Sequence, residues 1–156
     1  LYNRRYFQDI FEKKLSLLNR YDYQFSFALL DIDFFKDYND FYGHHQGDIA
    51  LQEISNVLKN TLNRPNDYVF RVGGEEFAIL LPETTLEDSV KVAERLRIEI
   101  SNAAVLIEKE KEVKFTSSFG VVSTSKSNID DLLVKADKAL YKAKDGGRNR
   151  VCTFIE

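Results

Sequence analysis

The sequence predicts an α+β domain in which a mixed or mainly antiparallel sheet is packed against helices. Two observations favour this class. Helical and strand-like segments are interspersed along the chain instead of separating into an all-helical and an all-strand half. The strand-like runs 68–72 and 77–81 are joined through Gly73-Gly74, a pair suited to a tight turn with positive φ. Because such a hairpin joins antiparallel strands, the sheet cannot be wholly parallel.

Five segments are predicted to be helical, the longer ones because their apolar residues recur at the spacing of an amphipathic helix. Asn3 is placed to cap the first helix, and Gly146-Gly147 ends the last one. The predicted helices are 3–19, 34–41, 47–62, 85–102 and 129–144.

The other regular segments are predicted to be strands. The first is a short apolar run that ends at Asp31, and a smaller hairpin is expected around residues 108–112. No internal repeat, low-complexity tract or linker interrupts the sequence, so residues 1–156 are expected to form a single domain. The predicted strands outside the small hairpin are 25–30, 68–72, 77–81, 114–123 and 151–155.

Composition narrows the class of protein further. With 44% hydrophobic and 30% charged residues, the chain is typical of a folded, water-soluble domain. The net charge of −3 argues against a nucleic-acid surface, which would be basic. The lone Cys152 cannot form an internal disulfide, and no apolar stretch reaches the roughly 20 residues of a membrane span, so a cytoplasmic domain is expected. The absence of methionine predicts a piece of a longer protein, whose membrane attachment stays open.

Two pairs of carboxylates are candidates for a metal site. Asp31 and Asp33 lie where the first strand ends, and because strand side chains alternate between faces, these two can share one side. Glu75 and Glu76 follow the glycine pair, and since adjacent side chains diverge, only one of them can readily join Asp31. Mg²⁺ prefers such oxygen ligands and often completes its shell with substrate phosphates. Ordinary solvated carboxylates at a strand end and a turn are the alternative interpretation.

Asp33 directly precedes the short helix that is predicted to begin near Phe34. A helix N-terminus presents unpaired N–H groups and the positive end of the helix dipole, which together bind phosphate. Acidic side chains beside such a backbone indicate metal-assisted phosphoryl chemistry. For Asp33 by itself, simple capping of the helix is an equally good explanation.

Several motifs together resemble one family. Residues 73–77, GGEEF, resemble the GGDEF signature. The family's other motifs are matched at its own spacing by NRR at 3–5, DIDFFKDYND at 31–40, GHHQGD at 43–48, ADKALYKAK at 136–144 and GRN at 147–149. The resemblance covers essentially the whole chain. By it, the sequence is identified as a member of the GGDEF family of diguanylate cyclases.

The resemblance implies a fold and an activity. The family fold is a central five-stranded, mainly antiparallel sheet surrounded by helices, similar to the palm of nucleotide polymerases and class III nucleotide cyclases. The implied reaction condenses two GTP molecules into cyclic di-GMP, a bacterial second messenger, and releases two pyrophosphates. The 3′-hydroxyl of one GTP attacks the α-phosphate of the other. Each protomer would hold one GTP, so a homodimer is needed for catalysis.

The resemblance also implies two divalent cations, Mg²⁺ or Mn²⁺, in each active site. Asp31 and Glu75 match the catalytic carboxylates that hold these cations, and Ile32 matches a residue that offers its backbone carbonyl. Glu75 is the family's candidate general base as well. Because a metal-bound carboxylate is a weak base, we prefer its role as a ligand.

Asn39 and Asp48 match the residues that read guanine. An ionised carboxylate only accepts hydrogen bonds, and guanine offers it two donors, N1–H and the exocyclic amine, that adenine does not offer together. From the sequence alone, Asp48 could instead cap the following helix, and Lys144 could simply be a cation at a helix C-terminus. The positions that match phosphate contacts are the backbone N–H groups of Phe34 and Phe35 and the cations Lys36, Lys144 and Arg148.

A second ligand site is implied by Arg64-Pro65-Asn66-Asp67, which resembles the family's inhibitory RxxD motif at the expected distance before the hairpin. Arginine and aspartate can bind the phosphates and guanine of cyclic di-GMP. Arg95 matches a further arginine of this site in some members. The resemblance therefore implies allosteric inhibition by the product. A plain polar turn containing Pro65 and Asn66 is the alternative.

The resemblance further implies a regulatory or sensor module in the longer protein. The alternative function is a catalytically silent GGDEF domain that acts as a GTP- or cyclic di-GMP-binding switch. Such members usually lose the metal aspartate or the signature acid, whereas Asp31 and Glu75 are both present. Asp48 argues against a cyclase with relaxed base choice. The GGEEF hairpin argues against a class III-like or polymerase-like enzyme outside the family.

Overall fold

The structure is a computed structural model that describes residues 4–21, 23–107 and 111–155. The expected cap residue Asn3 and the middle of the hairpin expected around residues 108–112 lie outside the described residues. The elements in chain order are α1 (Arg4–Tyr21), β1 (Phe25–Ile32), α2 (Phe35–Tyr42), α3 (His44–Thr61), β2 (Tyr68–Arg71), β3 (Glu76–Leu81), α4 (Leu86–Asn102), β4 (Val105–Ile107), β5 (Lys111–Val113), β6 (Ser117–Thr124), α5 (Ile129–Asp145) and β7 (Arg150–Thr153).

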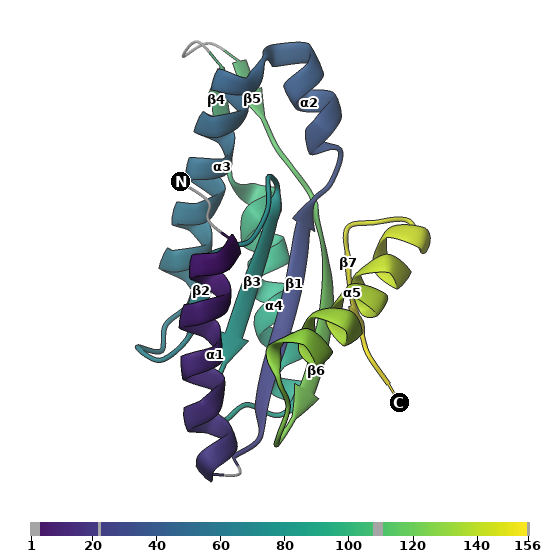
Figure 1. The fold of residues 1–156 in the computed structure, drawn as a ribbon. Helices are drawn as coiled ribbons and strands as arrows, with labels where there is room; N and C mark the ends of the chain where they lie inside the picture. Colours follow the sequence, from purple (N-terminus) through teal and green to yellow (C-terminus); the bar gives the residue numbers. More distant parts are fainter. Residues whose placement is uncertain (1–3, 22, 108–110, 156) are drawn as a thin grey trace.

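The central sheet has five strands in the order β2-β3-β1-β6-β7 (Figure 1). β1 pairs antiparallel with β3 and with β6, β2 pairs antiparallel with β3, and β7 joins β6 in parallel. The expected mainly antiparallel five-stranded sheet is therefore confirmed. β4 and β5 form a separate antiparallel pair on either side of residues 108–110.

Helices cover both faces of this sheet. α1 and α5 lie on one face, and α3 and α4 lie on the other (Figure 1). Alternate residues of β1 reach the two sides: Phe27 and Leu29 pack with α1 and α5, whereas Leu30 and Ile32 pack with the helices opposite. Burial on both faces explains why this central strand is a continuous apolar run in the sequence. Each described helix is too short or too polar to span a lipid bilayer.

The connection between β2 and β3 is not the tight glycine turn expected from the sequence. β2 ends at Arg71 and β3 begins at Glu76, so residues 72–75 join the two strands. Neither Gly73 nor Gly74 has a positive φ. Val72 is buried in the core beneath α1, and its N–H donates to the carbonyl of Glu76 at 2.9 Å. The connection has the same length as the one predicted between the two strands but is shifted by one residue toward the N-terminus.

Two other boundaries differ from the prediction by three residues. β6 begins at Ser117 rather than at residue 114, because Phe115 turns into a cluster with Phe35 and Tyr38, at ring-centroid distances of 6.0 and 4.9 Å. α3 begins at His44, three residues earlier than predicted. The preceding Gly43 has φ 90°, which lets the chain pass directly from α2 into α3.

α5 lies close against β6 because small residues meet there. Ala136, Ala139 and Ala143 are fully buried on the inner side of α5. A Cβ atom on Gly120 of β6 would overlap with the backbone of Ala136 and Leu140. This close approach sets the position of α5, whose C-terminal end reaches the end of β1 where Asp31 lies.

We expect Gly120→Ala to lower the free energy of unfolding by about 2–3 kcal/mol, because the added methyl group must push α5 away from the sheet. Chemical denaturation followed by circular dichroism would measure the change. Gly74→Ala is the matched control, since a Cβ there meets nothing within 4 Å and the backbone has no positive φ. Its unfolding free energy should stay within about 0.5 kcal/mol of the parent. Equal losses in the two variants would contradict this account of α5 packing.

Candidate active site

A cavity of ≈ 220 Å³ lies where β1 ends, between the β2–β3 connection, the start of α2 and the end of α5. Its walls combine carboxylates, cations and the first backbone N–H groups of α2. All of the residues predicted to bind metal and phosphate therefore surround one space. The lining residues are Asp31, Ile32, Asp33, Phe34, Phe35, Lys36, Asp37, Glu75, Lys144 and Arg148.

The two predicted metal-binding carboxylates, Asp31 and Glu75, are brought together by strand pairing. Asp31 lies opposite Glu76 in the β1–β3 register. The N–H of Ile32 donates to the carbonyl of Glu75 at 3.2 Å. Because the N–H and C=O of a strand residue point to the same neighbour, the carbonyl of Ile32 faces the β2–β3 connection. The cavity thus offers two carboxylates and one backbone oxygen from adjacent strands.

Opposing effects act on the pKa of the Asp31 carboxyl group. Burial raises the pKa of its carboxyl group, and the negative charges of Glu75 and Asp33 act in the same direction. The hydrogen bond and the positive charge of Lys144 lower it. Lys144 forms an ion pair with Asp31 from the last turn of α5. The lysine ammonium therefore lies against the carboxylate that the sequence predicts to be a metal ligand.

The start of α2 supplies the predicted phosphate-binding backbone. Phe34 precedes the helix in a left-handed conformation, with φ 59°, and its carbonyl accepts the first helical hydrogen bond from Tyr38 at 3.2 Å. The N–H groups of the first turn remain without helical acceptors and border the cavity. The ring of Phe35 is buried in the core, whereas the ring of Phe34 is 63% exposed. The guanidinium carbon of Arg148 lies 4.9 Å from the Phe34 ring centroid.

Asp33 does not cap α2, which corrects one of the two readings of the sequence. The helix has no side-chain cap. The Asp33 carboxylate instead accepts from the hydroxyls of Thr116 and Ser118, both at 2.7 Å, and from the backbone N–H of Asn149 at 3.0 Å. Asp33 is only 5% exposed. Its two oxygens are committed to the protein, so it differs from Asp31 in what it can still bind.

The predicted guanine readers lie on two helices beyond this cavity. Asn39 belongs to α2 and Asp48 to α3. Asp48 is the fifth residue of α3, which excludes the idea that it caps this helix. The Oδ1 atom of Asn39 is buried without a hydrogen-bond partner among the described residues. A Cβ atom on Gly47 would overlap with this same Oδ1 atom, so glycine at position 47 leaves room for the Asn39 amide.

The two residues of the predicted inhibitory motif, Arg64 and Asp67, bind each other. Arg64 and Asp67 form an ion pair at 2.7 Å, in which the Arg64 side chain is 49% exposed and that of Asp67 only 5%. The Arg64 guanidinium also donates to the Pro82 carbonyl and to the Thr84 hydroxyl, each at 2.7 Å. Arg95 donates to the carbonyl of Thr61 at 3.1 Å. The structure thus joins Arg64 with Asp67 and directs Arg95 to the end of α3.

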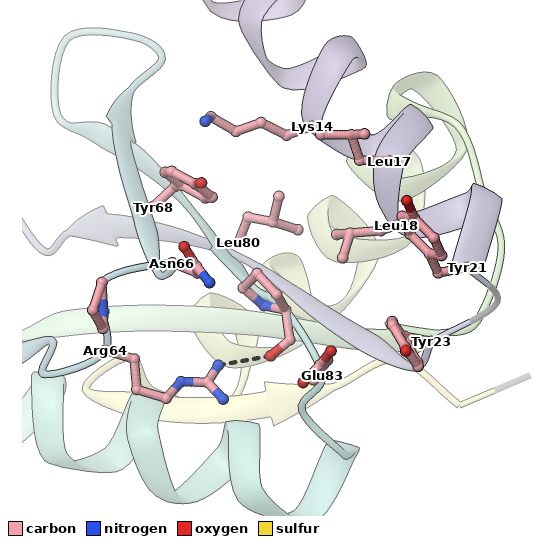
Figure 2. A pocket seen from close by; sticks show the side chains of 12 residues that line it. Lys14, Leu17, Leu18, Tyr21, Tyr23, Arg64, Asn66, Tyr68, Leu80 and Glu83 are labelled. Carbon is pink, nitrogen blue, oxygen red and sulfur yellow. Dashed lines mark hydrogen bonds between the residues drawn. The ribbon is translucent and has the colours of Figure 1, made fainter.

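A larger cavity of ≈ 600 Å³ adjoins Arg64 on the side of α1 (Figure 2). Tyr21 and Tyr23 stack at its rim, with centroids 6.0 Å apart. The ammonium of Lys14 lies 3.5 Å from the centroid of the Tyr68 ring. This cavity is separate from the one between Asp31 and Glu75, and sequence reasoning did not predict its aromatic wall.

Sequence reasoning also missed two features that shape the site. The hydrogen bonds of Asp33 to Ser118 and Asn149 span 85 and 116 positions of the chain, so no local motif signals them. The contact of Gly47 with Asn39 joins two motifs that were read separately. Because the helix was predicted to begin at Gly47, glycine at this position gave no signal of the second feature.

Comparison with known proteins places the chain in a family. The family model "Diguanylate cyclase, GGDEF domain" matches residues 1–150. YhcK of Bacillus subtilis is 40% identical over 97% of this chain and 43% of its own length. Diguanylate cyclase DgcM of Escherichia coli is 39% identical over 97% of this chain and 36% of its own length. The chain therefore spans less than half of these curated relatives.

Solved structures agree with this assignment. The active GGEEF domain of a diguanylate cyclase from Vibrio cholerae superimposes with a TM-score of 0.86 at 32% identity, covering 100% of this chain and 99% of the other. The GGDEF domain of DgcB from Caulobacter crescentus, solved in complex with c-di-GMP, gives a TM-score of 0.88 at 30% identity, covering 97% and 90%. Fold and relatives agree, and the chain belongs to the GGDEF family of diguanylate cyclase domains.

Proposed function

We propose that this chain, as a single domain of residues 1–156 within a longer signalling protein, condenses two GTP molecules into cyclic di-GMP. The observation that carries the proposal is the shared cavity of Asp31, Glu75, the start of α2 and Arg148. In each half of the reaction, a bond forms between a 3′-oxygen and an α-phosphorus. The bond from that phosphorus to the β-phosphate bridge breaks, and pyrophosphate leaves.

The residues present fit a pair of Mg²⁺ or Mn²⁺ ions that are shared with a nucleotide. Among the described residues, three or more acidic, histidine or cysteine side chains nowhere gather into a cluster fit for a metal. Asp31, Glu75 and the Ile32 carbonyl supply hard oxygen donors but an incomplete shell, as expected where phosphates and water provide the rest. When bound, such cations activate the attacking hydroxyl and stabilise the charge of the leaving pyrophosphate.

The chain's own groups would orient the triphosphate. The N–H groups of Phe34 and Phe35 would donate to phosphate oxygens at the N-terminus of α2. Lys36 and Arg148 border the same cavity and would balance the negative charge. Lys144 would exchange its bond to Asp31 for one to a phosphate when a cation takes its place. Positioning and charge neutralisation of this kind account for most of the acceleration in phosphoryl transfer.

Guanine would be read by Asn39 and Asp48. Asp48 is exposed and accepts only, so it suits guanine N1–H and the exocyclic amine. The partnerless amide oxygen of Asn39 is an acceptor that a ligand would satisfy. Gly73 and Gly74 in the β2–β3 connection also support a nucleotide at this place. Neither a positive φ nor contact with the rest of the protein requires glycine at either position. A closely approaching ligand would require it.

The site of product inhibition would be formed by Arg64, Asp67 and Arg95. The half-exposed guanidinium of Arg64 and the adjoining cavity in Figure 2 support a ligand at this place. The relative DgcB was solved in complex with c-di-GMP. Binding through both Arg64 and Asp67 requires their ion pair to open, because Asp67 is almost fully enclosed in the closed form.

Catalysis requires two protomers, because each brings one GTP and the two nucleotides attack each other. Product formation should therefore rise faster than linearly with protein concentration in a GTP turnover assay with Mg²⁺, read by chromatography of cyclic di-GMP and pyrophosphate.

Glu75→Gln keeps the shape of the side chain and removes its charge. We expect this variant to lose at least about 100-fold in turnover while it still binds GTP.

Glu112→Gln is the matched control, since Glu112 is an exposed glutamate on β5, remote from the cavity, and its variant should turn over normally. Unchanged turnover in Glu75→Gln would refute the role of Glu75. Absence of product from the unaltered protein, at high concentration and with bound nucleotide removed, would favour a GTP- or cyclic di-GMP-binding switch over an enzyme.

The ion pair of Lys144 with Asp31 predicts opposite effects on metal and nucleotide. Lys144→Met should strengthen Mn²⁺ binding to the nucleotide-free protein by about tenfold, since Asp31 is left without its cation. The same change should weaken GTP binding, because one phosphate contact is lost. Calorimetric titrations with Mn²⁺ and with GTP would measure both effects. Lys142→Met is the control, because Lys142 is an exposed lysine in the same last turn of α5, and it should alter neither affinity. Unchanged Mn²⁺ affinity in Lys144→Met would refute competition between Lys144 and the metal for Asp31.

The contact of Gly47 with Asn39 makes a further prediction. Gly47→Ala should lower GTP affinity by about tenfold, because its methyl group displaces the Asn39 amide from the base. In the Asn39→Ala background, the same alanine should cost nothing more, since no amide is left to displace. Equilibrium binding of GTP to the two single variants and the double variant tests this, and additive losses would show that Gly47 acts independently of Asn39.

A further inference from the structure

Asp33 is a buried carboxylate that the proposed reaction leaves without a role. It lies two residues after Asp31, borders the same cavity and is 5% exposed. Its three partners, the hydroxyls of Thr116 and Ser118 and the N–H of Asn149, are neutral groups of the protein. Each of its oxygens already accepts a bond, so Asp33 is poorly placed to bind a cation. A buried charge of this kind needs a reason, because burial disfavours it.

Its contact with Asn149 reaches a strained loop that follows α5. Gly147, Arg148 and Asn149 have φ values of 118°, 63° and 48° in succession. Two of these are ordinary residues in the left-handed region, which costs free energy and persists only where surrounding bonds impose it. The N–H of Arg148 donates to the carbonyl of Ala143 at 2.9 Å. Asn149 is held from both sides, through its N–H by Asp33 and through its Oδ1 by Arg97 at 2.8 Å.

This loop carries Arg148 to the cavity. The guanidinium lies over the exposed ring of Phe34, 4.9 Å from its centroid, at the start of α2. The backbone of Arg148 is fixed by α5, by the bond between Asn149 and Asp33, and by Arg150, whose Nε donates to the Arg148 carbonyl at 3.0 Å. Of these, only the bond to Asp33 ties the loop to the end of β1, so its loss would let the guanidinium shift away from the phosphate end of the site.

We propose that Asp33 is a positioning residue for recognition of the triphosphate, which acts by holding the N–H of Asn149 and thereby keeping Arg148 over the cavity. This inference rests on the proposed GTP site. A carboxylate is suited to the task because it only accepts hydrogen bonds. Asparagine at position 33 could keep this bond, with its oxygen toward the Asn149 N–H and its NH₂ group toward the Ser118 hydroxyl, which can rotate to accept. Alanine at position 33 removes the acceptor altogether.

The rival explanation is that Asp33 only stabilises the fold by joining β1 to the start of β6. Thr116→Val separates the two explanations, because it removes one of the hydroxyl bonds to Asp33 next to the start of β6 and leaves the bond to Asn149 intact. Asp33→Ala removes both. If Asp33 acts only through the sheet, the two variants should behave alike toward nucleotides.

The experiment compares the affinities of 3′-deoxy-GTP and 3′-deoxy-GMP by calorimetry with Mg²⁺. Neither compound has the attacking hydroxyl, so no product forms. We expect Asp33→Ala to reduce the preference for the triphosphate by about tenfold, with monophosphate affinity unchanged. Thr116→Val should keep the preference. Arg148→Ala should reproduce the loss, and Asp33→Ala should add nothing in the Arg148→Ala background.

Additive losses in the double variant, or an equal loss in Thr116→Val, would overturn the proposal. If the unaltered protein itself showed no preference for the triphosphate, the proposed GTP site would fail, and this inference with it.

A second measurement needs no variant. In the unaltered protein, the Asn149 amide should exchange slowly with solvent deuterium although Asn149 is exposed. Exchange at the rate of an unstructured peptide would refute the hydrogen bond on which the inference depends.

Discussion

The register of β1 between β3 and β6 is the constraint on which the active site depends. It places Asp31 opposite Glu76 and opposite Ser118, and the next residue, Ile32, bonds to the backbone of Glu75. A slip by one residue would turn Asp31 to the opposite face of the sheet and expose the apolar side chains that now pack under the helices. Because β1 is buried on both faces, its core packing and its carboxylate position are fixed by the same pairing.

The second part of the site comes from α5 and the loop after it. Gly120 and the alanines of α5 let this helix lie close to β6, and the helix then ends beside Asp31. Asp33 ties the following loop to the same strand end. Two short segments far apart in the sequence, around residues 31–33 and 144–149, are thus held together from both directions, by helix packing and by a buried carboxylate.

Much of this arrangement follows from the sequence. The apolar period of α1, α4 and α5, and the continuous apolar run of β1, indicate these elements to within a few residues. The motifs identify the family and place Asp31 and Glu75 correctly in one cavity. The sequence was misleading where distant residues decide the local structure. Packing of Phe115 against α2 delays β6, and the partners of Asp33 lie more than 80 positions away. Local propensity carries no information about such contacts.

The closed pair of Arg64 and Asp67 has a consequence for signalling. Within the proposed site of product inhibition, any ligand that uses both side chains must first separate them, and it competes for the Nη2 atom of Arg64 with the Pro82 carbonyl and the Thr84 hydroxyl. Apparent affinity falls in proportion to the fraction of molecules that are open. Under that proposal, the concentration of messenger that halts its own synthesis would depend on the turn at residues 82–84 as well as on the pair itself.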